Sequence, residues 1–108
     1  MSDRLPTSLI VEGALRLLAG QGIYHHFIQR GNQSSGIIML KLNGLSGQVR
    51  LITQERNFIT DELEWVNALP QERIEEREAD DYINRAIARD PDLCVIEIED
   101  RDMHNPFE

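Results

Sequence analysis

The chain has 108 residues, of which 41% are hydrophobic and 28% charged, and its formal net charge is −8 at pH 7. This is the composition of a globular protein with a core of its own, which excludes a disordered chain. Residues 1–60 carry six Lys and Arg against three Asp and Glu, whereas residues 61–108 carry five against sixteen. A phosphate backbone requires clustered positive charge, so nucleic acid is an unlikely partner of this chain.

Cys94 is the only cysteine, which excludes an internal disulfide and favours a reducing compartment. It lies inside a predicted strand, where a thiol behaves as a small buried hydrophobic group. An apolar run near the N-terminus is interrupted by Glu12 and Arg16, and no run is long enough to span a bilayer. We therefore expect a cytoplasmic protein without membrane contact, folded as a single domain over residues 1–108.

The first predicted element is a helix near the N-terminus. Thr7 or Ser8 can cap its start, because short hydroxyl side chains accept hydrogen bonds from the first backbone N–H groups of a helix. Gly20 and Gly22 end it. The residues predicted for its buried stripe are Ile10, Ala14, Leu17 and Leu18.

Three β-like runs follow, at 23–30, 36–43 and 47–54. The connections GNQSS and GLS have the composition of hairpin loops, which predicts an antiparallel meander. After a longer loop at 55–60, residues 63–69 are predicted to form a shorter fourth strand.

Pro70 is expected to open a long helix over residues 71–89. The helix must end at or before Asp90, because Pro91 disfavours helical geometry in the residue before it. A strand at 93–99 follows. The predicted fold is α+β, a single, mostly antiparallel sheet of about five strands with two helices packed on it, in the order α-β-β-β-β-α-β.

The two faces of strand 36–43 differ in composition. If Ile38, Leu40 and Leu42 face the helices, the opposite face still carries Ile37 and Met39, besides Lys41. Such a face is too apolar to be solvated. Either one helix covers it, or it is the contact surface of a twofold homodimer.

Two groups of residues could bind a metal. His25 and His26 are adjacent on a strand and so point to opposite faces, which prevents them from sharing an ion. Asp100, Asp102 and His104 alternate and could share a face, but three weak ligands in a tail seldom form a site without further donors. A solvated acidic tail is the favoured interpretation, and we expect no metal or other cofactor.

The run DPDLCVIEIED at residues 90–100 surrounds an apolar strand with carboxylates. Asp90 or Asp92 is predicted to turn the chain beside Pro91 by accepting nearby backbone N–H groups. Glu97 and Glu99 share one strand face and need cations opposite them. The predicted partners are Arg50 and Lys41, followed by Arg30.

The run RDPDLCVIEIEDRD follows an acidic helix containing DDYINRAI, and RG…GIIMLKLN and an isolated Trp65 precede both. With these features the chain resembles, over nearly its whole length, the domain-of-unknown-function family 1491. The resemblance implies a small bacterial protein of one domain, with no assigned activity, cofactor or catalytic residues. The family usually has a tryptophan where this chain has Cys94.

Two functional hypotheses follow. The first is a small non-enzymatic interaction or accessory module with a protein partner, because no nucleophile–base pair, ligand cluster or phosphate loop has the required spacing. The second is a metal-binding protein or enzyme that uses His25 or His26 with the C-terminal carboxylates. The candidate binding residues are His25, His26, Trp65, Glu97, Glu99, Asp100, Asp102 and His104.

Overall fold

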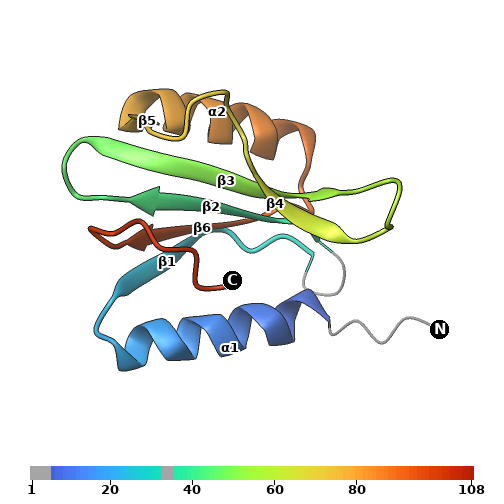
Figure 1. The fold of residues 1–108 in the computed structure, drawn as a ribbon, viewed down its shortest axis with the longest axis horizontal. Helices are drawn as coiled ribbons and strands as arrows, with labels where there is room; N and C mark the ends of the chain where they lie inside the picture. Colours follow the sequence, from blue (N-terminus) through green and yellow to red (C-terminus); the bar gives the residue numbers. More distant parts are fainter. Residues whose placement is uncertain (1–5, 33–35) are drawn as a thin grey trace.

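The structure is a computed structural model, and it describes residues 6–32 and 36–108. A single sheet lies between two helices, one on each face (Figure 1). In the described part of the chain, no helix is long and apolar enough to cross a membrane. In chain order the elements are α1 (Thr7–Gly20), β1 (Tyr24–Gln29), β2 (Ile38–Asn43), β3 (Gln48–Arg56), β4 (Leu63–Asn67), β5 (Ile74–Glu75), α2 (Glu76–Arg89) and β6 (Cys94–Glu99).

The sheet has the strand order β1-β6-β2-β3-β4, and the two-residue β5 pairs with β3 beside this path. β2 and β6 are parallel, and the other pairs are antiparallel. The α+β class and the mostly antiparallel sheet are confirmed. The meander prediction is wrong for β1 and β2, because β6 lies between them. β6 has fully buried apolar side chains on both faces, with Ile96 and Ile98 on one and Val95 on the other, and a central position buries them most completely.

The connection after β1 passes close to the start of β6. Gly31 has a φ of +66°, and a Cβ there would lie 2.4 Å from the carbonyl oxygen of Asp92. The Asn32 N–H donates to the same oxygen over 2.9 Å. Only glycine fits this approach. Residues 33–35, part of the predicted hairpin loop, lie outside the described residues.

α1 packs on one face of the sheet through Val11 and Leu18, against apolar side chains of β2 and β6. Two details differ from the sequence prediction. Leu17 is 55% exposed, since the buried stripe of the helix runs through Val11 instead. Thr7 does not cap the helix, because its hydroxyl is buried and donates to the Gly36 carbonyl oxygen over 3.0 Å.

α2 covers the opposite face, where Ala79, Ile83 and Ala86 pack on side chains of β2, β3 and β6. Of the two alternatives for this apolar face, the structure therefore shows the covering helix. The homodimer stays a prediction, but this face cannot be its contact surface because α2 covers it. α2 begins at Glu76, later than predicted, because Ile74 and Glu75 pair with β3 as β5.

Candidate functional site

The structure does not bring the predicted site residues together. His26 and Glu97 lie on the α2 side of the sheet, whereas His25 pairs with Ile98 on the α1 side. Asp100, Asp102 and His104 lie in the segment after β6, and Trp65 lies on β4. Among the described residues, no group of three or more His, Cys, Asp or Glu is arranged to hold a metal ion.

Lys41 is the centre of a polar cluster between the sheet and α2. It is only 3% exposed, and its Nζ lies 2.7 Å from Glu76 Oε2 and 2.8 Å from Asp80 Oδ1. Glu97 Oε1 is 3.5 Å away on the neighbouring strand. The sequence placed Lys41 opposite Glu97 correctly. It did not show that α2 turns two of its own carboxylates inward to the same ammonium group.

The cluster keeps Lys41 charged. Burial acts to lower the pKa of the Lys41 ammonium group, but hydrogen bonds to Asp80 and Glu76 and the charge of Glu97 outweigh it and raise that pKa. A lysine of this kind is a poor nucleophile or base, because its lone pair is occupied by a proton. Its role in the structure is to join β2, β6 and α2.

Two further side chains belong to this cluster. The Asn43 side-chain amide donates to Glu97 Oε2 over 3.0 Å, and the Leu45 N–H donates to Asn43 Oδ1 over 2.9 Å. The second side chain is that of His26, at the open edge of the sheet, whose Nε2 lies 3.6 Å from Glu97 Oε1. The cluster thus joins β2, β6 and α2, and through Asn43 it also holds the start of the β2–β3 turn.

Glu99 and Arg50 lie apart. Glu99 stands opposite Asn43 and Tyr24 in the sheet register, with no cation beside it in the described part of the chain. Arg50 instead donates to the Met103 carbonyl oxygen over 3.1 Å, and its Nε lies 3.6 Å from Glu72 Oε1. Arg50 is on the α1 side because it pairs with Leu42.

The carboxylates after α2 and β6 bind backbone N–H groups. Asp90 Oδ1 accepts the Asp92 N–H over 3.0 Å, which confirms the predicted turn beside Pro91. Asp100 accepts the N–H groups of Asp102 and His104 over 3.0 and 3.3 Å. Asp100 therefore shapes the C-terminal turn.

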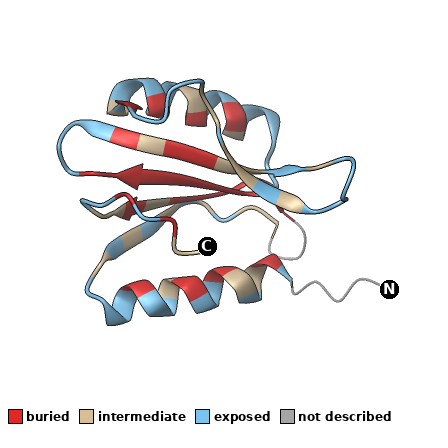
Figure 2. Cartoon of the chain, in the orientation of Figure 1, coloured by how far each residue is buried: buried red, intermediate tan, exposed pale blue. Residues whose placement is uncertain are grey.

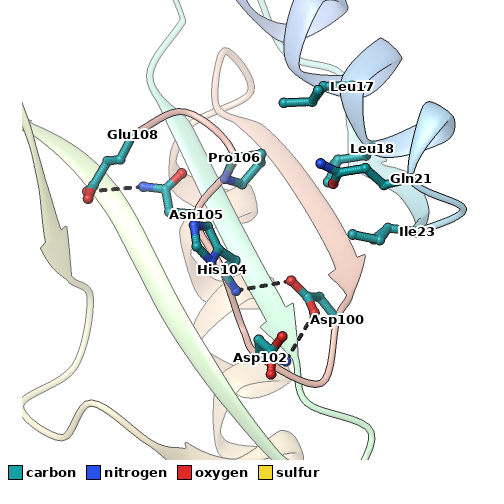
Figure 3. Close-up of a pocket in the computed structure, with 10 residues that line it drawn as sticks. All are labelled: Leu17, Leu18, Gln21, Ile23, Asp100, Asp102, His104, Asn105, Pro106 and Glu108. Atoms are coloured by element: carbon teal, nitrogen blue, oxygen red, sulfur yellow. Dashed lines mark hydrogen bonds between the residues drawn. The ribbon is translucent and has the colours of Figure 1, made fainter.

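A cavity of about 290 Å³ lies between the end of α1 and the C-terminal segment (Figure 3). Leu17, Leu18 and Ile23 form its apolar side, and acidic side chains and His104 face them from the C-terminal segment. Neither His25 nor His26 lines this cavity. The C-terminal carboxylates thus meet His104 there, and not the two histidines of β1.

Cys94 is 1% exposed on β6. Burial raises the pKa of its thiol to about 11, against a smaller opposing effect of Arg30. The thiol is therefore protonated at neutral pH, and a protonated, buried thiol is not a nucleophile.

Among the described residues, the most exposed large apolar side chains are at the tip of the β3–β4 hairpin, which the sequence predicts only as a longer loop. Phe58 is 94% exposed and Ile59 95%. Figure 2 shows this tip as an exposed projection beyond the layers of the fold. The sequence signal was present in NFITD, where two large apolar residues stand between turn-forming residues.

Hydrogen bonds hold the tip in one shape. Asn57 Oδ1 accepts the N–H groups of Ile59 and Thr60 over 2.8 and 3.2 Å, and the Asn57 side-chain amide donates to Glu64 over 2.7 Å. Arg56 Nη1 donates to the carbonyl oxygen and to Oδ1 of Asp61. The tip is therefore preorganised.

Trp65 fixes the base of this hairpin. It is half-buried, packs on the core beneath α1, and its ring centroid lies 5.5 Å from that of Phe107. The C-terminal segment thus holds β4 to the body of the protein.

The comparisons with known proteins agree with this fold. The sequence model of a family described as "Protein of unknown function (DUF1491)" matches residues 5–108. A crystal structure of a DUF1491 family protein from Caulobacter crescentus is 27% identical, with a TM-score of 0.83 and coverage of 97% of this chain and 95% of that one. An NMR structure of a DUF1491 family protein from the same organism is 27% identical, with a TM-score of 0.80 and coverage of 94% and 91%.

The solution structure of protein Atu0922 from A. tumefaciens is 21% identical, with a TM-score of 0.71 and coverage of 89% and 86%. This likeness concerns the fold alone. No curated protein matches the chain.

Proposed function

This chain belongs to the DUF1491 family, whose description assigns no activity, and from its geometry we propose that it is a protein-interaction module whose contact element is the β3–β4 hairpin tip. The observation that carries the proposal is the exposure of Phe58 and Ile59, at 94% and 95%. Two adjacent large apolar side chains in water are unfavourable for the isolated chain. They become favourable when a partner covers them.

The magnitude is sufficient for specific binding. Burying one Phe or Ile side chain contributes about 1.5–3 kcal/mol. Aromatic anchors of this kind act as hot spots when they enter a pocket of the partner. The hydrogen bonds of Asn57 and Arg56 order the tip before binding, which lowers the entropy that docking must overcome.

The described residues supply less support for the enzyme or metal hypothesis. His26 faces Glu97, and Glu97 also faces the Lys41 ammonium group, which disfavours a metal cation beside it. The cavity beside His104 is lined by Asp100, whose carboxylate accepts two backbone N–H groups. The interaction module is therefore the function that the geometry favours.

Site-specific cross-linking tests this proposal. We would replace Phe58 with the photo-cross-linker p-benzoylphenylalanine, in cells of the source organism, and place the same group at Leu45 as a control. Leu45 is 51% exposed in the turn at the other end of β3. Like the tip residues, it is an exposed apolar side chain in a turn that an asparagine side chain holds.

The expected result is one discrete protein adduct at position 58, which is lost when Ile59→Ser is added and is absent at position 45. The partner is then identified from the adduct and produced in pure form. The same diffuse adducts at both positions, or no adduct at position 58, would contradict the proposal.

A further inference from the structure

We infer that the hairpin tip docks into an apolar socket rimmed by Lys or Arg side chains on a different protein. The inference rests on the proposed function and adds the chemistry of the partner. It comes from the charges around Phe58 and Ile59, which are net negative.

The rim of the tip is acidic. Residues 55–64 contain four carboxylates and one cation, Arg56. That guanidinium group already donates to Asp61 twice, at 2.9 and 3.0 Å, so it neutralises a carboxylate of the tip itself. A partner therefore meets a net negative ring around two apolar side chains.

Two of the carboxylates oppose each other. Glu55 and Glu64 are direct partners in the register of β3 and β4, and both are exposed. Like charges in this arrangement repel across a sheet. Glu64 accepts a hydrogen bond from Asn57, but within the described part of the chain the Glu55 carboxylate makes no hydrogen bond or ion pair. A cation from a partner removes this repulsion.

Glu62 extends the same ring at the tip. It is exposed, and its carboxylate also makes no hydrogen bond or ion pair among the described residues. The Glu62 backbone does help to hold the hairpin, since its carbonyl oxygen accepts the Asn57 N–H, but neither of the two carboxylates, of Glu55 and Glu62, has such a role. Both can be neutralised without loss of the contacts that order the tip.

The charges argue against two other occupants. An anionic membrane surface would be repelled by the acidic ring. A second copy is also disfavoured, because each chain has a net charge of −8 and the cavity beside α1 carries Asp100, Asp102 and Glu108. A cationic rim on a different protein complements both features of the tip.

The test measures Kd by calorimetry between the pure chain and the protein identified by cross-linking at position 58. Three forms of the chain are compared: the natural chain, Glu55→Gln with Glu62→Gln, and Glu75→Gln with Glu78→Gln. The last pair is the matched control. It removes two exposed carboxylates near the start of β3, since Glu75 pairs with Gln48, at the opposite end from the tip.

We expect the Glu55/Glu62 variant to bind about tenfold more weakly at 50 mM salt, the control about as tightly as the natural chain, and the difference to shrink at 300 mM salt. Circular dichroism checks that each variant is folded. If both double variants bind the partner equally weakly, or if neither binds more weakly than the natural chain, the inference of a cationic rim is wrong. If Phe58→Ser still abolished binding in that case, the interaction module itself would stand.

Two further measurements address the other occupants. Flotation with vesicles of phosphatidylcholine and phosphatidylglycerol should show no binding that depends on Phe58. Light scattering of the pure chain at increasing concentration should show no assembly that Phe58→Ser removes. Tip-dependent binding in either assay would overturn the inference and assign the tip to a membrane or to a second copy.

Discussion

The turns at the two ends of β3 begin alike and end differently. Each starts with an asparagine whose side-chain oxygen accepts the N–H two residues later: Asn43 binds Leu45, and Asn57 binds Ile59. Asn43 is 9% exposed and also donates to Glu97 in the Lys41 cluster. Among the described residues, the partners of Asn57 all belong to its own hairpin, and the residues after it extend into solvent.

This contrast separates structure from recognition. The β2–β3 turn is anchored to the core, since Gly44 lies against Met103 and Asn43 joins the buried charges. The β3–β4 tip is ordered locally and contributes its apolar side chains to nothing within the described chain. We therefore expect changes at the first turn to affect stability and changes at the second to affect binding.

Removal of the anchor should have the largest effect. Lys41→Met retains much of the aliphatic stem but leaves the largely buried Glu97 without its cation. Loss of one partner of a buried pair costs about 3 kcal/mol. Urea unfolding should show this decrease in the free energy of unfolding at pH 7. A change below 1 kcal/mol would mean that the cluster does not anchor the turn.

The two asparagines should differ in the same assay. Asn43→Ala breaks a partly buried hydrogen bond to Glu97 and the turn together, and should lower the free energy of unfolding by about 2 kcal/mol. Asn57→Ala breaks exposed hydrogen bonds and should cost under about 1 kcal/mol. Equal losses in the two variants would remove the distinction between the turns.

High pH should weaken the anchored end selectively. The pKa of Lys41 is raised in the folded state above its ordinary value of 10.5, so its stabilising contribution is complete below pH 10.5 and is lost as the pH rises through the folded-state value. The decrease should be smaller than that caused by Lys41→Met at pH 7. Unfolding at pH 9 and above, compared between the natural chain and Lys41→Met, measures it. The Lys41→Met variant should lack the part of the decrease in the free energy of unfolding at high pH that comes from deprotonation of Lys41.

The smallest effect on folding is expected at the tip. Phe58→Ser with Ile59→Ser removes two side chains that are almost fully exposed, so the free energy of unfolding should change by less than about 0.5 kcal/mol. The same urea titration tests this. A loss above 1 kcal/mol would show that the tip packs on the protein in solution, and the proposed contact element would then be a structural one.

Local pattern determined the elements and several contacts. The apolar runs, the position of Pro91 and the bonding of short acidic side chains predicted the last strand, the end of α2 at Arg89 and the Asp90–Asp92 turn. Lys41, which lies beside Glu97, is one of the three cations predicted opposite Glu97 and Glu99, because carboxylates on a half-covered sheet face repel each other without nearby cations. These inferences depend on neighbours in sequence or on alternation along a strand.

Only the tertiary structure decided which strands are neighbours and which apolar residues find a partner. β6 enters between β1 and β2 because a strand with apolar side chains to bury on both faces is buried best at the centre of the sheet. That position places Glu97 beside Lys41 and lets α2 direct Glu76 and Asp80 to the same ammonium group. Leu17, Phe58 and Ile59 are as apolar as the core residues, yet they are exposed. Hydrophobicity drives burial of a residue only where the fold brings a surface against it, and sequence pattern alone does not contain that surface.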